Sequence, residues 1–227
     1  MEKFETIYNR AVKRKGGEQA LSSLLSRPKS KSELALMGSD RILSEMTKKI
    51  FQSGFVWRVV EQKWPNFEEV FFDFDIEKIL MMPDDMIERK ASDPKIIRNF
   101  NKVKTIRENA LMLKDIIDDV GSVGKWLAEW PGEDIIGLWT YLKNHGARLG
   151  GNTGPYALRV LGKDTFILSR DVEFYFRAHK LIEGGASSKR SLQRVQETFN
   201  KWKEESNMSL QEVSQIVAFS IGDNPSR

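Results

Sequence analysis

The chain has 227 residues, of which 40% are hydrophobic, and a formal net charge of +4. This length allows one domain or two tightly joined lobes with a real core, and the pI near 9.1 favours a polyanionic partner. The absence of cysteine excludes disulfides, thiolate catalysis and zinc sites built on sulfur. No apolar run approaches about 18 residues and the N-terminus lacks a secretory core, so we expect a cytoplasmic protein without membrane contact.

Apolar residues recur at spacings of three and four along almost the whole chain, and the alternation typical of strands is scarce. We therefore expect an all-α fold. Residues 1–35 are polar, with a break at Gly16 and Gly17, and are expected to form an N-terminal helical arm. Residues 36–227 are expected to form the main domain.

Three prolines predict helix starts, because a proline in the first turn of a helix costs no hydrogen bond. They are Pro65, Pro83 and Pro94. The third opens the longest predicted helix, which carries apolar side chains on one face over 96–117 and ends near Gly121. Such a helix usually lies at the centre of a bundle.

Two further predicted helices, 134–144 and 155–161, flank a connector that is rich in glycine. A turn of this kind points several backbone N–H groups at one place beside a helix N-terminus, where the helix dipole favours anions. The sequence therefore predicts a phosphate-binding turn, although a plain interhelical turn is the alternative. The predicted phosphate ligands are Arg148, Gly150, Gly151, Thr153, Gly154 and Arg170.

Asp171 begins the next predicted helix, at an end where the dipole favours its ionised form. An isolated aspartate before a helix is usually only an N-cap. Asp171, however, follows Gly154 by one short helix and a connector, which would return the carboxylate to the face of the glycine turn. The last two predicted helices cover 189–205 and 210–221.

These motifs carry a resemblance to known proteins. The glycine turn within 149–157 and the aspartate after it resemble the signature of the helix-hairpin-helix DNA glycosylases, in which a hairpin precedes a catalytic aspartate. Residues 42–110 are similar to the 3-methyladenine DNA glycosylase I family. The matching segments are Ile42-Leu43-Ser44-Glu45-Met46, Gln52-Ser53-Gly54-Phe55-Val56-Trp57 and Ile96-Ile97-Arg98-Asn99-Phe100-Asn101-Lys102-Val103-Lys104.

The resemblance implies a helix-hairpin-helix glycosylase domain over 36–227, built as a two-lobed helical bundle. An N-glycosidic bond breaks through an oxocarbenium-like sugar, which a fixed negative charge near C1′ stabilises. The resemblance implies that Asp171 supplies this charge and orients the attacking water. No metal or cofactor is expected.

The same resemblance implies a pocket that holds the base after it has left the duplex. Trp57 is the predicted stacking residue, with Gln52 and Phe55 close by, and the alternative is that Trp57 is a core tryptophan. Tyr156 is also placed at this pocket. It stands where bifunctional relatives carry the lysine of a Schiff base, so no lyase activity is expected.

Two departures from the family limit what can be carried over. Lys48-Lys49-Ile50-Phe51 stands where the family has the carboxylate that reads the flipped purine, so the lesion is left open. The family's zinc site of two Cys and two His is absent, since His145 and His179 are the only histidines.

The predicted function is that of a monofunctional DNA glycosylase that removes an alkylated, 3-methyladenine-like purine from double-stranded DNA in base-excision repair, acting as a monomer. The alternatives are a glycosylase of the same fold for another damaged or modified base, and a non-catalytic DNA-binding protein. An all-α protein-interaction domain is a weaker third alternative. The residue that wedges into the duplex and the role of residues 1–35 stay open.

Overall fold

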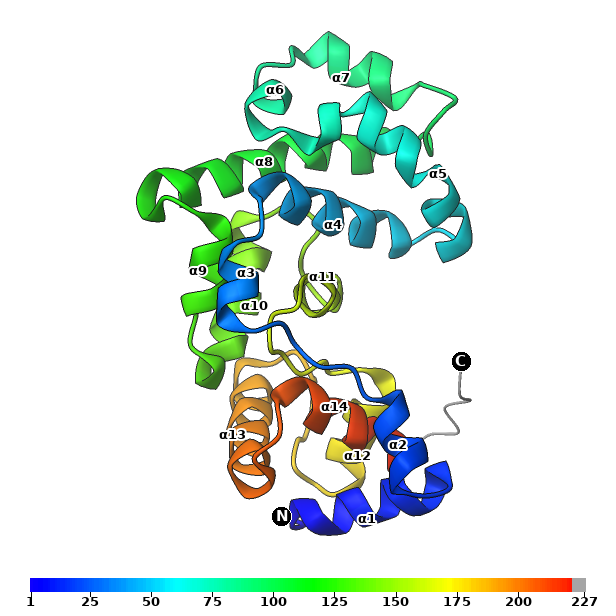
Figure 1. Ribbon diagram of the computed structural model, residues 1–227, viewed down its shortest axis with the longest axis vertical. Coiled ribbons are helices and arrows are strands. Elements are labelled where there is room, and N and C mark those ends of the chain that lie inside the picture. Colours follow the sequence, from blue (N-terminus) through cyan, green and yellow to red (C-terminus); the bar gives the residue numbers. More distant parts are fainter. Residues whose placement is uncertain (222–227) are drawn as a thin grey trace. The chain divides into compact units, whose positions relative to one another are not determined.

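The computed structural model describes residues 1–221, and these contain helices and no strands, which confirms the all-α prediction (Figure 1). They form two compact units. Among the described residues, the first unit contains Met1–Lys29, Trp130–Leu138 and residues 162–221, and the second contains Ser30–Glu129 and Trp139–Leu161. No helix within residues 1–221 is both long enough and apolar enough to cross a membrane.

The first unit is a helical bundle around its last helix, α14, which packs against α1, α12 and α13 (Figure 1). Its core is aromatic, because the rings of Phe166 and Phe199 stack at 4.4 Å and Trp202 lies edge-on to Phe199. The helices of this unit are α1 (Phe4–Lys15), α2 (Glu18–Leu24), η2 (Gly132–Asp134), α12 (Arg170–Ala178), α13 (Lys189–Ser206) and α14 (Leu210–Phe219).

The second unit centres on α4, which packs against α5, α8 and α11. Helix α10 (Ile135–His145) begins in the first unit and continues in the second. The other helices of the second unit are α3 (Lys31–Ala35), α4 (Ser39–Gln52), α5 (Trp57–Val70), η1 (Phe72–Phe74), α6 (Ile76–Leu80), α7 (Asp84–Ala91), α8 (Phe100–Val120), α9 (Val123–Glu129) and α11 (Thr153–Leu161).

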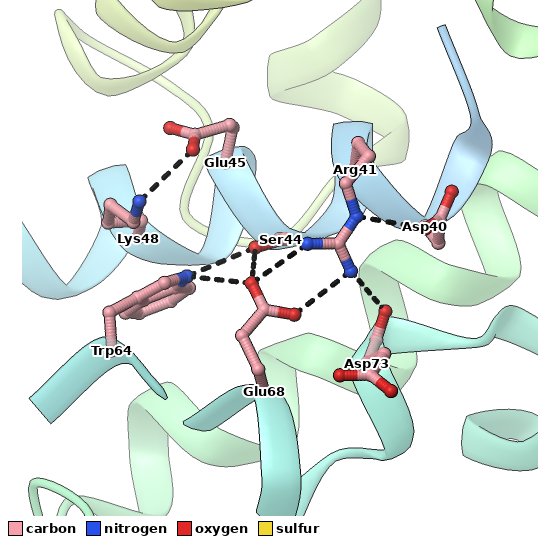
Figure 2. A network of polar contacts seen from close by, with 8 residues as sticks. All are labelled: Asp40, Arg41, Ser44, Glu45, Lys48, Trp64, Glu68 and Asp73. Atoms are coloured by element: carbon pink, nitrogen blue, oxygen red, sulfur yellow. Dashed lines mark hydrogen bonds and ion pairs between the residues drawn. The ribbon is translucent and has the colours of Figure 1, made fainter. Parts of the chain in front are cut away.

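A polar network fixes α5 against α4 (Figure 2). Glu68 of α5 accepts hydrogen bonds from the Ser44 hydroxyl (2.6 Å), from Trp64 Nε1 (3.0 Å) and from Arg41 (2.9 Å). Arg41 also donates to the carbonyl oxygen of Asp73, and its hydrogen bond to Glu68 raises the pKa of the guanidinium. Because these polar groups are paired with one another, the network fixes the register of α5 against α4 at this end of their contact.

Two of the helix starts predicted from proline are wrong. Pro65 lies inside α5, which begins at Trp57, because the burial of the apolar face of this helix outweighs the cost of one missing hydrogen bond. The long helix begins at Phe100 instead of Pro94: the Asn99 side chain caps it, and Lys63 holds the carbonyl oxygens of Pro94 and of the next residue outside the helix. The predicted start at Pro83, the N-cap of α7, and the stop at Gly121 are confirmed.

Candidate functional site

The glycine turn joins α10 to α11, where the hairpin was predicted. Gly151 has a φ of +61°, and a Cβ on Gly154 would lie 2.4 Å from the carbonyl oxygen of Leu149. The Gly154 N–H donates to that oxygen (3.1 Å), so this amide serves the turn itself. Among residues 1–221, the N–H groups of Gly150, Gly151 and Thr153 donate to no protein acceptor. Three amides are therefore available to an anion.

A buried amide on α8 fixes the entry to this turn. The side chain of Asn109 donates from Nδ2 to the carbonyl oxygen of Ala147 (3.1 Å) and accepts at Oδ1 from the Ala147 N–H (2.8 Å). Arg148 follows in a left-handed conformation, with φ +58°, and its side chain is exposed. Sequence reasoning missed Asn109, whose signal is a polar residue among the apolar side chains of the long predicted helix.

Trp57 is not a core residue. Its side chain is 46% exposed, whereas Trp64, on the same helix, is 5% exposed. The Nε1 of Trp57 donates to the carbonyl oxygen of Gln52 (3.1 Å), which fixes the ring at the C-terminal end of α4. An aromatic ring that is held in place and half open to solvent is suited to stack on a flat ligand.

Gln52 is buried and joins two charged residues. Its Oε1 accepts from the ammonium of Lys49 (2.6 Å), and its Nε2 donates to Glu61 (2.7 Å). The Lys49 ammonium also lies over the Trp57 ring, 4.9 Å from the centroid, and burial lowers the pKa of Lys49. Sequence reasoning missed Lys49 and Glu61. Lys49 precedes Gln52 by three residues on α4 and Glu61 follows Trp57 by four on α5, and both spacings put the two side chains on one face of a helix.

A second ammonium lies beside Phe55, at the end of α4. Lys102 donates to the carbonyl oxygen of Ile50, where the C-terminal end of the helix favours a cation. Its ammonium is 5.5 Å from the centre of the Phe55 ring. Burial lowers the pKa of Lys102, and the nearby charge of Arg148 lowers it further. Arg148, which precedes the glycine turn, and Phe55 therefore both lie near the ammonium of Lys102.

Asp171 lies half-buried in the first turn of α12. The predicted start of this helix is wrong, because the helix begins at Arg170 and its N-cap is Ser169, whose hydroxyl accepts from the Val172 N–H (3.3 Å). Asp171 is therefore not the cap that its position suggested as an alternative. In the described part of the chain, its carboxylate accepts no hydrogen bond and forms no ion pair with the protein.

The predicted site residues fall into two sets. The turn, the segment from Gln52 to Trp57, and the half-buried Tyr156 of α11 belong to the second unit, and Arg170 and Asp171 belong to the first. The structure thus brings the turn and the Trp57 segment into one compact unit. The idea that the turn and the Asp171 carboxylate face one sugar stays a prediction.

The two histidines make ring contacts. His145 stacks on Tyr141 at 4.3 Å, and His179 stacks on Tyr175 at 4.0 Å. Over residues 1–221, His, Asp and Glu side chains form no group of three or more that could hold a metal ion.

We compared the sequence and the fold with those of known proteins. Residues 36–148 match the methyladenine glycosylase family. The chain is similar to the 8-oxoguanine DNA glycosylase of Methanocaldococcus jannaschii, with a TM-score of 0.58 and 15% identity over 94% of this chain and 92% of that chain. The same comparison with a structure of the M. jannaschii 8-oxoguanine glycosylase/lyase in complex with a 15mer DNA containing 8-oxoguanine gives a TM-score of 0.57 and 16% identity, over 94% and 96% of the two chains.

A second kind of relative matches a smaller part of the chain. It is 3-methyladenine DNA glycosylase I from Staphylococcus aureus, with a TM-score of 0.50 and 24% identity over 56% of this chain and 78% of that chain. No protein with a curated description matches the chain. The helical fold, the hairpin between α10 and α11 and the match over residues 36–148 agree with one another. Residues 36–148 are therefore similar to the methyladenine glycosylase family, and the described chain has the helical fold of these solved DNA glycosylases.

Proposed function

We propose that this chain is a monofunctional DNA glycosylase of base-excision repair. It binds double-stranded DNA that contains a damaged base, and it hydrolyses the N-glycosidic bond of that base without cutting the strand. We propose further that it acts as a monomer in the cytoplasm. The family match over residues 36–148 is the observation that carries this proposal.

The glycine turn supports DNA binding. Three of its amides have no protein acceptor within residues 1–221, and the exposed Arg148 stands beside them. Backbone amides and an arginine bind a phosphate without reading the sequence of the bases. The affinity for duplex DNA is therefore expected to fall as the salt concentration rises.

Asp171 supports hydrolysis. Its carboxylate is not needed to cap α12, because Ser169 does this. A negative charge near C1′ stabilises the oxocarbenium-like sugar as the base leaves, and the same carboxylate orients the water that attacks C1′. Tyr156 cannot form the Schiff base of a lyase, which supports water as the nucleophile.

The first candidate substrate is an alkylated purine such as 3-methyladenine, in line with the family match. Such a base is positively charged in DNA, so it leaves without the help of a strong acid. The second candidate is a neutral damaged base, which the pairing of Lys49 and Glu61 beside Trp57 favours.

The substitution Asp171→Asn tests the proposed activity. We expect the rate of base release from damaged duplex DNA to fall by about 100-fold to 1,000-fold, while the affinity for the duplex stays the same. Released bases are identified by mass spectrometry, and affinity is measured by fluorescence anisotropy. Glu173→Gln is the matched control, because it neutralises a carboxylate in the same helical turn. An equal loss of both quantities, or of neither, would favour a DNA-binding or structural protein.

The substitution Gly151→Asp tests the phosphate-binding turn. A Cβ at this position meets no atom within 4 Å, so the substitution adds a negative charge, and the strain of its positive φ is matched in the control. We expect the affinity for duplex DNA to fall about tenfold. Gly121→Asp is the control, since Gly121 also has a positive φ and open space around it. Unchanged affinity in the Gly151 variant would contradict the assignment of the turn and favour an interaction domain.

A further inference from the structure

The surroundings of Trp57 contain one cation and one anion that the first candidate substrate does not explain. Lys49 comes from α4 and lies over the ring, and Glu61 follows Trp57 by one helical turn on α5. The buried amide of Gln52 joins them, accepting from Lys49 at 2.6 Å and donating to Glu61 at 2.7 Å. All four residues belong to the second unit, so this arrangement is internal to one compact body.

Both charged groups keep capacity for a further partner. An ammonium has three donors and a carboxylate has about four acceptor positions. Within the described residues, Gln52 is the one hydrogen-bond acceptor of the Lys49 ammonium. Glu61 accepts one hydrogen bond from Gln52, has the Lys48 ammonium at 3.9 Å and stays mostly open to solvent. The half-exposed Trp57 ring therefore has a donor and an acceptor with spare capacity among its neighbours.

This pair of charges disfavours a cationic base. The face of the Trp57 ring already holds the Lys49 ammonium, and a second cation would compete for the same electrostatic attraction. Lys49 and Glu61 together have no net charge, so they give a cation no compensating attraction. A neutral ring with a carbonyl oxygen next to an N–H, the lactam edge, offers one partner to the ammonium and one to the carboxylate.

We propose that Lys49 and Glu61 make this site selective for neutral damaged bases with a lactam edge over positively charged alkylated purines. The selectivity rests on the proposed glycosylase function and concerns the same site. The charge that develops on the departing base supports the same selectivity. When the C1′–N bond of a neutral base breaks, its electron pair stays with the base, which leaves as an anion and then takes a proton. An ammonium donor beside the ring stabilises that anion, whereas a cationic purine leaves as a neutral base and needs no such donor.

The test measures single-turnover base release by the full chain from two groups of duplex DNA. One group contains hypoxanthine or 8-oxoguanine, which have lactam edges, and the other is treated with dimethyl sulfate and followed through the release of the cationic 3-methyladenine, which has no lactam edge. We expect the wild-type chain to release a lactam base at least about tenfold faster. Lys49→Met is expected to slow the release of that base by about 10-fold to 100-fold, the range for a lost hydrogen bond to a charged group, without slowing the release of the cationic purines.

Two further variants make the result independent of folding defects. Lys49→Arg keeps the charge and is expected to keep the preference, whereas Glu61→Gln is expected to reduce the release of the lactam base about tenfold. Lys104→Met, an exposed lysine on α8, is the matched control and should leave the ratio of the two rates unchanged. If cationic purines are released as fast as lactam bases and Lys49→Met leaves that ratio unchanged, the selectivity is wrong and the glycosylase function stands. If no base is released from any duplex, both are wrong.

Discussion

The two ends of the α4–α5 helix pair use the same kinds of side chain for different purposes. At one end, Trp64 is buried and Glu68 accepts hydrogen bonds from three donors, one of them the Arg41 guanidinium (Figure 2). At the other end, Trp57 is half-exposed, and Lys49 and Glu61 each keep capacity for another partner. A tryptophan, a carboxylate and a cation stabilise the fold where every group is paired, and they form a candidate binding site where groups are left to pair with a ligand.

Removing the two indole rings gives the largest contrast. Trp64→Ala is expected to lower the free energy of unfolding by about 3–5 kcal/mol, because it leaves a cavity and removes the indole N–H that donates to Ser44 and Glu68. Trp57→Ala is expected to change it by less than about 1 kcal/mol. In the folded protein, however, Trp57→Ala should slow base release about 10-fold to 100-fold through the loss of stacking. Urea unfolding and single-turnover release measure the two effects, and similar stability losses for both variants would refute the contrast.

The two carboxylates are expected to differ next. Glu68→Ala removes the acceptor of three donors and is expected to lower the free energy of unfolding by about 2–3 kcal/mol, without changing which base is released. Glu61 lies at the exposed end of the same helix and accepts one hydrogen bond, from Gln52, so Glu61→Ala is expected to lower the free energy of unfolding by about 1 kcal/mol. Urea unfolding at pH 7 compares the two. A large stability loss for Glu61→Ala would make its end of the helix pair structural as well.

The buried amide of Asn109 extends the comparison to the glycine turn. Asn109→Ala removes both hydrogen bonds to Ala147 and is expected to cost about 2 kcal/mol of stability. It should also weaken DNA binding, because the entry to the turn is no longer fixed. Asn101→Ala, at an exposed position of the same helix, is the control and should change neither quantity. If the Asn109 variant is destabilised but binds DNA as tightly as the wild type, DNA binding by the glycine turn does not depend on Asn109.

The smallest effect concerns the backbone that Arg41 holds. Phe72, Asp73 and Phe74 have φ values of 57°, 55° and 60°, a left-handed conformation that costs about 1 kcal/mol or more for a residue with a Cβ. Asp73→Gly keeps the carbonyl oxygen that Arg41 binds and is expected to raise the free energy of unfolding by about 1 kcal/mol. Asp75→Gly should instead lower it, because the Asp75 side chain caps α6. Thermal unfolding distinguishes the two variants, and a loss of stability for Asp73→Gly would show that its side chain matters.

Local patterns predicted much of the fold. The helical class, the stop at Gly121 and the hairpin around Gly151 were all readable, because each depends on spacing or on a conformation that glycine adopts most easily. The start of α8 was missed, since it depends on Lys63, a residue of another helix that holds the carbonyl oxygens before it. Pro65 was misleading for a similar reason, because the packing of α5 overrides a local preference.

For the candidate site, the sequence by itself determined the residue types: a glycine turn, one aspartate near a helix start, and a tryptophan after a short loop. Only the tertiary structure decided which tryptophan is exposed, which residue caps α12, and which charges meet beside Trp57. The reason is physical. Helix propensity and turn conformation act between neighbours in the chain, whereas burial and the pairing of Lys49 with Gln52 and of Gln52 with Glu61 depend on how α4 and α5 pack.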